Sequence, residues 1–324
     1  MNPIAEEFPK IFRLEIPLPG NPLKAINSYV IQGAERFLMI DTGMNRPECL
    51  EAMQRHLQEL KVDLQATDFF ITHLHADHLG LVSELTGNSS RIYFNHPDAA
   101  FIQNENRWEE MMVQAGMNGF PEEELGDAIQ KHPGRKYHAR GSLRFTLLGE
   151  GDRIRIGEYV FQCVETPGHT PGHMCLYEPN AKIFFSGDHL LGSITPNISS
   201  WAEDDDSLEK YLKSLDKIRG YEISWVLPGH RRPFAQPRQR IAELEHHHAV
   251  RNVEILTILQ EGARNAYQVA GEMIWDIDCE TWEDFPIPQK WFAAGEALAH
   301  LQFLRANGRV KRELHNGKAF FCLA

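Results

Sequence analysis

The sequence is poor in cysteine, contains no long apolar run and has fewer basic than acidic residues. Its five cysteines are odd in number, lie far apart and form no Cys-x-x-Cys pair, which argues against a disulfide framework and a thiolate zinc site. No apolar stretch approaches the roughly 18 residues of a membrane helix, and the first residues lack a basic region followed by an apolar core. We therefore expect a cytoplasmic protein that carries no export signal and no membrane span.

The excess of acidic residues limits the kinds of partner. The chain has 33 Lys and Arg against 45 Asp and Glu, a formal net charge of −12. A general binder of nucleic acid or anionic membranes needs basic surface to displace counterions, so both classes are disfavoured, although a local basic patch stays open. At 324 residues, of which 42% are hydrophobic and 24% charged, the chain has room for one large domain and a small one, or for two of medium size.

The densest group of chemically active side chains lies at residues 72–80, Thr-His-Leu-His-Ala-Asp-His-Leu-Gly. The apolar run Phe69–Ile71 is typical of the end of a buried strand, and Leu79–Val82 of the start of a helix. A turn between them can aim alternate side chains at one point. Imidazole and carboxylate bind divalent metals such as Zn²⁺, and a site rich in both can hold two ions about 3.5–4 Å apart. The motif therefore predicts a metal site.

Short β-prone runs precede the motif at 12–16, 27–32 and 37–40, and the turns between them predict an antiparallel opening sheet. Asp41 ends the third run, ahead of a helix expected near 47–60. Two interpretations of Asp41 stay open. It either forms the turn itself, or it is an outer partner that orients a metal-binding histidine.

Three later segments repeat the pattern of an apolar strand followed by a polar residue. The loop 166–173, Thr-Pro-Gly-His-Thr-Pro-Gly-His, offers His169 and His173, and we favour His169 because it follows the strand end at once. Asp188 follows the strand at 182–187, where a carboxylate can bridge two cations, and His230 follows the strand at 225–228. His96 also follows a strand, but no other ligand-type residue accompanies it, so we interpret it as a turn residue.

Residues 98–140 differ in character from their surroundings. Apolar residues recur at helical intervals around 100–113, and a second helical piece is expected at 122–131. About forty such residues between two strands are too many for an ordinary connection, which indicates an insertion. It either packs onto the core or forms a lid over a substrate cleft. We favour the lid because long insertions often carry function.

The last residues predict a second, smaller module. Helical segments are expected at 241–260, 266–274 and 289–307, followed by a hairpin around Asn316-Gly317. This order is typical of a winged helix, and its tip is made basic by Arg305, Arg309, Lys311, Arg312 and Lys318. The module either binds nucleic acid or serves packing and dimerisation, and the acidic whole favours packing. The run His246–His248 lies inside a helix, so we expect neither a purification tag nor a metal site there.

The candidate ligands resemble, in type and order, the complete His-x-His-x-Asp-His…His…Asp…His signature of the metallo-β-lactamase superfamily over about residues 10–235. The resemblance implies that the first metal is held by His73, His75 and His169, the second by Asp77, His78 and His230, and that Asp188 bridges them. It also implies the α+β class, as an αββα sandwich with the metal site at one edge of its two sheets.

The C-terminal segment carries a second resemblance. Residues 295–301 are similar to the small winged-helix domain found in lactamase-like endoribonuclease relatives. The expected organisation is a catalytic metallo-β-lactamase domain at 1–238, with a helical insertion at about 98–140, and a winged-helix-like domain at 239–324.

The implied ligand set predicts a hydrolase. Two cations that share a water lower its pKa from 15.7 toward about 7, which supplies a metal-bridging hydroxide as the nucleophile. Asp77 is the expected catalytic residue, because it can accept a proton from the nucleophile, and no Gly-x-Ser-x-Gly segment suggests a serine instead. We favour a small ester, thioester or lactone as substrate. The second hypothesis is a single-strand endoribonuclease or phosphodiesterase, and the third a non-catalytic sensor or an oxidoreductase.

The expected cofactors are two divalent ions, zinc first and iron or manganese as alternatives, since His and Asp ligands accept all three. The expected partner is a small-molecule substrate, and nucleic acid is not favoured. We expect no membrane partner, and a homodimer stays open. The sequence identifies no substrate-binding residue.

Overall fold

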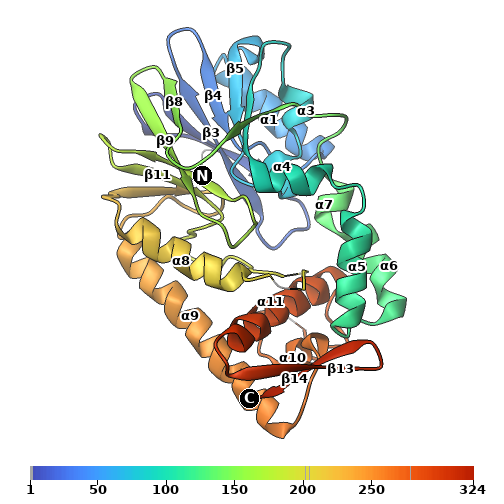
Figure 1. Ribbon diagram of the computed structural model, residues 1–324. Coiled ribbons are helices and arrows are strands. Elements are labelled where there is room, and N and C mark those ends of the chain that lie inside the picture. Colours follow the sequence, from blue (N-terminus) through green and yellow to red (C-terminus); the bar gives the residue numbers. More distant parts are fainter. Residues whose placement is uncertain (1–2, 201, 204, 278) are drawn as a thin grey trace. The chain divides into compact units, whose positions relative to one another are not determined.

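The computed structural model describes residues 3–200, 202–203, 205–277 and 279–324 (Figure 1). They divide into two compact units. Unit 1 comprises the residues up to 103 with 133–196 and 214–240, and unit 2 comprises 104–132, 197–213 and 241–324. Most of the expected insertion therefore clusters with the C-terminal residues. The predicted domain boundary at 238/239 stays a prediction.

Unit 1 contains a seven-stranded mixed sheet. Its strands lie in chain order, β1 (Ile4–Phe8), β2 (Ile11–Pro17), β3 (Ala25–Gln32), β4 (Phe37–Ile40), β5 (Thr67–Phe70), β6 (Ile92–Asn95) and β7 (Phe145–Leu148). The first four pair antiparallel, which confirms the predicted opening sheet, and β4 to β7 pair parallel. Strand β1 was not predicted, because its two central glutamates obscure the apolar pattern at the sheet edge.

A second mixed sheet of five strands completes unit 1. Its order is β12 (Trp225–Pro228), β11 (Ile183–Gly187), β10 (Met174–Glu178), β9 (Tyr159–Glu165) and β8 (Arg153–Ile156). Strands β11 and β12 pair parallel, and the other pairs are antiparallel. Strands β10 and β11 are buried along their whole length, as expected for strands in the middle of a core sheet.

The two sheets share one apolar core. Tyr29 and Phe70 of the first sheet and Phe161 and Phe185 of the second belong to the same buried cluster, and the rings of Tyr29 and Phe185 lie 5.1 Å apart. The other face of the seven-stranded sheet packs in a separate cluster with the helices α1 (Pro47–Glu59), α2 (Ala76–Leu79), α3 (Val82–Leu85) and α4 (His96–Gln103). The predicted α+β class, with two mixed sheets and helices, is confirmed.

Unit 2 is mainly helical. It contains α5 (Arg107–Met117), α6 (Glu122–Lys131), α10 (Ala266–Glu272), α11 (Ile287–Ala306), and parts of α8 (Ser207–Arg219) and α9 (Pro237–Ile258). Trp291 of α11 is buried against Phe120, which precedes α6, with ring centroids 5.6 Å apart. The insertion helices α5 and α6 therefore pack into the core of unit 2. Their role as a lid stays a prediction.

A C-terminal hairpin ends the chain, formed by β13 (Val310–His315) and β14 (Lys318–Leu323). Asn316 and Gly317 have φ angles of 52° and 76°, the positive values that a tight two-residue hairpin turn requires. The predicted Asn-Gly hairpin is confirmed, whereas a complete winged helix stays a prediction.

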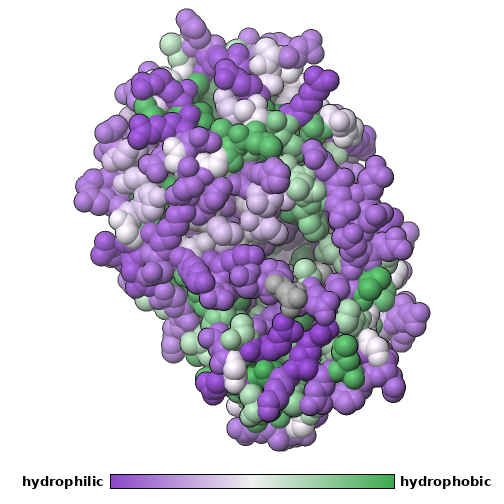
Figure 2. Space-filling view, in the orientation of Figure 1, coloured by the Kyte–Doolittle hydropathy of each residue, from purple (hydrophilic) through white to green (hydrophobic). Residues whose placement is uncertain are grey.

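The surface is rich in polar groups, and the face shown in Figure 2 is mostly hydrophilic. Isolated apolar side chains are exposed, of which Ile274 is the most open at 82%. Within the described part of the chain, no helix combines the length and the apolar character needed to cross a membrane.

Candidate metal centre

The central motif lies where strand β5 leads into helix α2. His75 directly precedes the helix and has extended backbone angles, φ −64° and ψ 148°. Asp77 and His78 lie inside the first helical turn, because α2 begins at Ala76, three residues before the predicted start at Leu79. A carboxylate in the first turn interacts favourably with the helix dipole, which explains the earlier start. The motif is thus divided between a connection and a helix.

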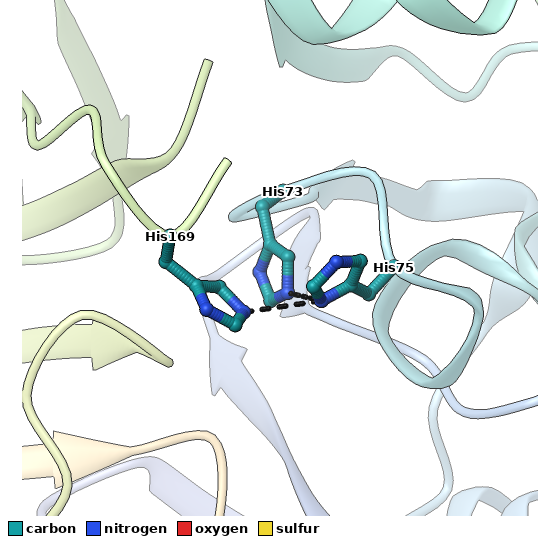
Figure 3. Close-up of side chains that lie close together, drawn as sticks. All are labelled: His73, His75 and His169. Atoms are coloured by element: carbon teal, nitrogen blue, oxygen red, sulfur yellow. Dashed lines mark hydrogen bonds between the residues drawn. The ribbon is translucent and has the colours of Figure 1, made fainter. Parts of the chain in front are cut away.

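Three imidazoles converge in the first group of candidate ligands, His73, His75 and His169 (Figure 3). The Nδ1 atom of His75 lies 3.0 Å from Nε2 of His73 and 3.0 Å from Nε2 of His169. With Zn–N distances of about 2.0–2.1 Å, neighbouring nitrogens of a tetrahedral site lie roughly 3 Å apart, so the spacing suits a single ion. Burial, together with His169, lowers the pKa of His75 to about 3, so its neutral ring keeps a lone pair for a cation.

The second group consists of Asp77, His78 and His230, and Asp188 lies within reach of both groups. The Nε2 atom of His230 lies 3.3 Å from Oδ2 of Asp77 and 3.4 Å from Oδ2 of Asp188. Asp188 oxygens also lie 3.5 Å from Nε2 of His78 and 3.7 Å from Nε2 of His169. The structure therefore brings all seven predicted residues together, and the oxygens of Asp188 lie within 3.7 Å of residues of both groups.

The two groups differ in charge. Burial raises the pKa of Asp77, but His78 and His230 outweigh it and lower the pKa to about 2, so the carboxylate is ionised. Burial lowers the pKa of His230, but Asp188 and Asp77 raise it to about 10. The carboxylates of the second group therefore attract positive charge, carried by imidazolium protons or by divalent cations.

Asp41 contacts the second group through the ring of His78. Its Oδ2 atom lies 2.7 Å from Nδ1 of His78, and its carboxylate accepts hydrogen bonds of 2.9 Å from both the backbone N–H and the hydroxyl of Thr72. The Nδ1 atom of His78 is thus engaged, which leaves Nε2 on the side of Asp188. The interpretation of Asp41 as an outer partner that orients a histidine is supported.

Asp98 is a second supporting carboxylate, and the sequence reasoning did not identify it. It is fully buried at the start of α4 and accepts hydrogen bonds from the N–H of Leu74 at 2.9 Å, the hydroxyl of Thr170 at 2.8 Å and the N–H of Gly172 at 2.6 Å. It therefore joins the loop that carries His73 and His75 to the loop that carries His169. The available signal was its place after a strand end, as for the predicted ligands.

The position of His230 is fixed by strand β3. Its Nδ1 atom lies 2.8 Å from the carbonyl oxygen of Ala25. The carbonyl of Pro228 accepts hydrogen bonds from the Asn27 side chain at 2.9 Å and from the Tyr29 hydroxyl at 2.8 Å. The opening sheet thus holds the end of β12, a strand of the other sheet.

The structure shows which histidine of the loop 166–173 lies with the other candidate ligands. His169 belongs to the first group, whereas His173 belongs to neither group and its ring stacks on that of His73, with centroids 5.1 Å apart. His96 is the exposed first residue of α4 and belongs to neither group.

The donor set fits divalent cations. The Nε2 atoms of His78 and His230 and the Oδ1 atom of Asp188 are buried, and although each lies within 3.5 Å of an oppositely charged or polar neighbour, none of them makes a hydrogen bond with the described residues. Burying such an atom without a partner costs about 1–3 kcal/mol, a cost that ligation would remove. Imidazole nitrogens and carboxylate oxygens are also the ligands that borderline divalent metals accept.

The matches to known proteins agree with the fold and the cluster. Residues 22–230 match the family model described as the metallo-beta-lactamase superfamily. Because this match spans more than half of the chain, the protein belongs to that superfamily, and its fold is the α+β metallo-beta-lactamase fold.

Two relatives and one solved structure illustrate the likeness. A crystal structure of a metallo-beta-lactamase family protein from Thermus thermophilus is 26% identical, with a TM-score of 0.84 over 98% of this chain and 100% of that chain. A beta-lactamase-like protein 2 homolog from Drosophila melanogaster is 26% identical over 89% of this chain and 85% of its own length. A thioesterase from Emericella nidulans is 27% identical over 74% of this chain.

The fungal relatives are longer than the part they share with this chain. The alignments span 66% of a lactamase-like protein from Penicillium aethiopicum, 62% of one from Aspergillus niger and 56% of the thioesterase from Emericella nidulans.

Proposed function

We propose that the protein is a metal-dependent hydrolase that acts on a small ester, thioester or lactone. The observation that carries the proposal is the convergence of His73, His75 and His169, and of Asp77, His78 and His230, around Asp188. We propose two divalent ions, zinc first, as the cofactors. We also propose that α9, α10, α11 and the hairpin form a winged helix that serves packing.

Each residue of the cluster has a role in this proposal. Bound divalent cations would lower the pKa of a shared water from 15.7 toward about 7 and polarise the substrate carbonyl. The three imidazoles of the first group supply neutral donors, and Asp188 supplies an anionic donor to both groups. Asp77 is the proposed catalytic residue: its buried carboxylate, 3.3 Å from His230, accepts the proton that the attacking water gives up.

Two observations favour a small substrate over RNA. One relative bears the name thioesterase, at 27% identity. In addition, Arg312 of β13 pairs with Glu203 at 3.2 Å and contacts the sulfur of Met117 at 3.2 Å, so it is engaged within unit 2. Because Arg312 is paired with Glu203, fewer basic side chains of the hairpin are available to bind phosphates. The net charge of −12 also opposes binding of a nucleic-acid backbone.

The test is hydrolysis by the metal-loaded protein. We expect turnover of chromogenic esters, thioesters or lactones that a chelator abolishes and added metal restores. Asp77→Asn should lower the rate by about 10²–10⁴-fold, the usual contribution of a general base. His96→Ala, which changes an exposed histidine outside both groups, is the matched control and should keep full activity.

A labelled single-stranded RNA, assayed at about 50 and 200 mM salt, tests the alternative. RNA cleavage that weakens steeply with salt, with no turnover of the small substrates, would replace the proposed substrate class by a nucleic acid. Fully metal-loaded protein that hydrolyses neither kind of substrate would refute the proposed activity.

A further inference from the structure

His173 is buried beside the candidate ligands but belongs to neither of their two groups. Its Nε2 atom accepts a hydrogen bond of 3.2 Å from the backbone N–H of Asp188, and its Nδ1 atom lies 2.8 Å from the hydroxyl oxygen of Thr166. Because Nε2 is the acceptor, the ring proton resides on Nδ1 and is donated to Thr166. The contacts therefore fix both the tautomer and the orientation of the ring.

The hydrogen bonds continue beyond Thr166. Its hydroxyl lies 3.2 Å from the sulfur of Cys175 in β10, and the Cys175 thiol donates to the carbonyl oxygen of Ser186 in β11 at 3.5 Å. Each group then donates one proton to the next: His173 to Thr166, Thr166 to Cys175, and Cys175 to Ser186. Ser186 lies two residues before Asp188. The hydrogen bonds therefore hold the end of β11 at two positions, the carbonyl oxygen of Ser186 and the N–H of Asp188.

The local backbone is shaped to receive the His173 ring. Gly187 has a φ of 48°, and a Cβ atom there would lie 2.7 Å from Nε2 of His173. Any larger residue would push the ring and the backbone of Asp188 apart. On its other side the ring stacks on His73, with an angle of 29° between the ring planes.

We propose that His173 is a positioning residue of the metal centre. Its ring accepts a hydrogen bond from the backbone N–H of Asp188 and stacks on the ring of His73. It thereby fixes the positions of Asp188, which is close to both groups, and of His73, which belongs to the first group. This inference rests on the proposed metal-dependent function. It assigns the second histidine of the Pro-Gly-His-Thr-Pro-Gly-His loop a role distinct from that of His169.

The experiment compares two substitutions of His173. His173→Leu removes both ring nitrogens, whereas His173→Gln keeps an acceptor oxygen at the end of the side chain. We expect His173→Leu to weaken the binding of zinc by about 10–100-fold, as removal of the partners of metal ligands usually does, and His173→Gln to restore part of the loss. Zinc affinity is measured by competition with a chromogenic chelator, and the Co²⁺ absorption spectrum reports the ligand geometry.

His56→Leu is the matched control. His56 is a buried histidine of α1 whose two ring nitrogens have no hydrogen-bond partner in the described chain, and it belongs to none of the ligand groups. The substitution therefore makes the same change in size and polarity without touching Asp188, and metal affinity should equal that of the wild type.

A second readout requires no metal. In the metal-free protein, His173→Leu should speed hydrogen exchange at the amide of Asp188, because that N–H loses its acceptor. Unchanged zinc affinity, Co²⁺ spectrum and exchange in His173→Leu would overturn the role of His173. A zinc affinity that depends on His173, in a wild-type protein that hydrolyses none of the substrates, would overturn the proposed activity alone.

Discussion

Asp41 shows how single residues are constrained around the candidate metal centre. Its φ of 55° lies in the left-handed region, which costs a residue with a Cβ atom roughly 1–2 kcal/mol. The three hydrogen bonds that its carboxylate accepts from Thr72 and His78 offset this cost. Strain of this kind persists where the surroundings hold it in place, and such places cluster at functional sites.

Gly229 leads to a prediction at the same scale. A Cβ atom at this position would lie 2.6 Å from Oδ1 of Asp188 and 2.8 Å from Cε1 of His78. Gly229 has no positive φ, so alanine suits the backbone and acts through the clash alone. We expect Gly229→Ala to fold, to displace Asp188 and His78, and to lower zinc affinity by about 10–100-fold. Competition with a chromogenic chelator measures this loss.

Gly126→Ala provides the control for that substitution. Gly126 lies in α6, and a Cβ atom there would meet nothing within 4 Å. Alanine should raise stability by about 0.5–1 kcal/mol through helix propensity and leave zinc affinity unchanged. Equal zinc affinities for the two variants would show that the space at Gly229 is not needed by the cluster.

At the scale of elements, the sequence was most informative where a strand ends in a polar residue. His73, Asp188 and His230 each follow a buried apolar strand, and period and composition make such strands recognisable. The strand that leads to His73 lies in one sheet and those that lead to Asp188 and His230 in the other, so the strand pattern identified the residues, and their meeting at one edge of the two sheets was implied by the family resemblance. Their role as ligands stays a prediction.

The supporting hydrogen bonds could not be predicted in this way. Asp98 and Thr166 act through backbone N–H groups and side chains from other segments, and no spacing along the chain announces such contacts. The start of α2 at Ala76 was missed for a related reason: Asp77 and His78 have weak intrinsic helix propensity, and the tertiary setting decides.

A buried histidine pair joins two helices of unit 2. The Nδ1 atom of His248 in α9 lies 3.2 Å from Nε2 of His300 in α11, and Nδ1 of His300 donates to the Asn252 side-chain oxygen at 2.8 Å. Burial, with His247 and Arg251 adding to it, lowers the pKa of His248 to about 3. The pair is therefore uncharged in the folded protein. The titratable groups around His248 are His247 and Arg251 on α9, His300 on α11 and Tyr211 on α8.

This pair predicts a loss of stability in mild acid. An unfolded histidine titrates near pH 6.5, whereas folded His248 stays neutral down to about pH 3. The stabilisation of the fold that comes from keeping His248 neutral is thus present above pH 6.5. It is lost as the pH falls, at up to about 1.4 kcal/mol per pH unit. Chemical unfolding at pH 7 and pH 5, followed by tryptophan fluorescence, should show a smaller loss, by about 2 kcal/mol, for His248→Gln than for the wild type.

The control lies two residues earlier on the same helix. His246 is exposed, so His246→Gln should keep the wild-type dependence on pH. Equal losses between pH 7 and pH 5 in the wild type and His248→Gln would mean that His248 takes up its proton without cost in the folded protein.

At the scale of the whole molecule, neither compact unit is continuous along the chain. The boundary expected at 238/239 follows the composition of the chain, whereas residues 104–132 cluster with 241–324 because Phe120 and Ile129 are buried in the same core as Trp291. A helical insertion has an amphipathic pattern whichever core it joins, so its pattern alone could not say where it packs.

All seven candidate ligands lie in unit 1, so metal should act as a ligand of that unit's folded state. A ligand at about 100 times its dissociation constant stabilises the folded state by about 2.7 kcal/mol, which corresponds to roughly 5–10 °C in melting temperature for a unit of this size. Calorimetry with and without zinc should show this rise.

Hydrogen exchange locates the stabilisation. With zinc, protection should increase most in segments of unit 1 such as 67–80 and 183–190, because opening them releases the metal, and least in 266–324 of unit 2. His169→Ala removes one nitrogen of the first group, so the rise in melting temperature should shrink while the metal-free protein stays folded. If zinc raised the melting temperature of His169→Ala as much as that of the wild type, and protection increased mainly in unit 2, the metal would bind outside the seven candidate ligands. A bound cation stabilises only the structure that must open to release it.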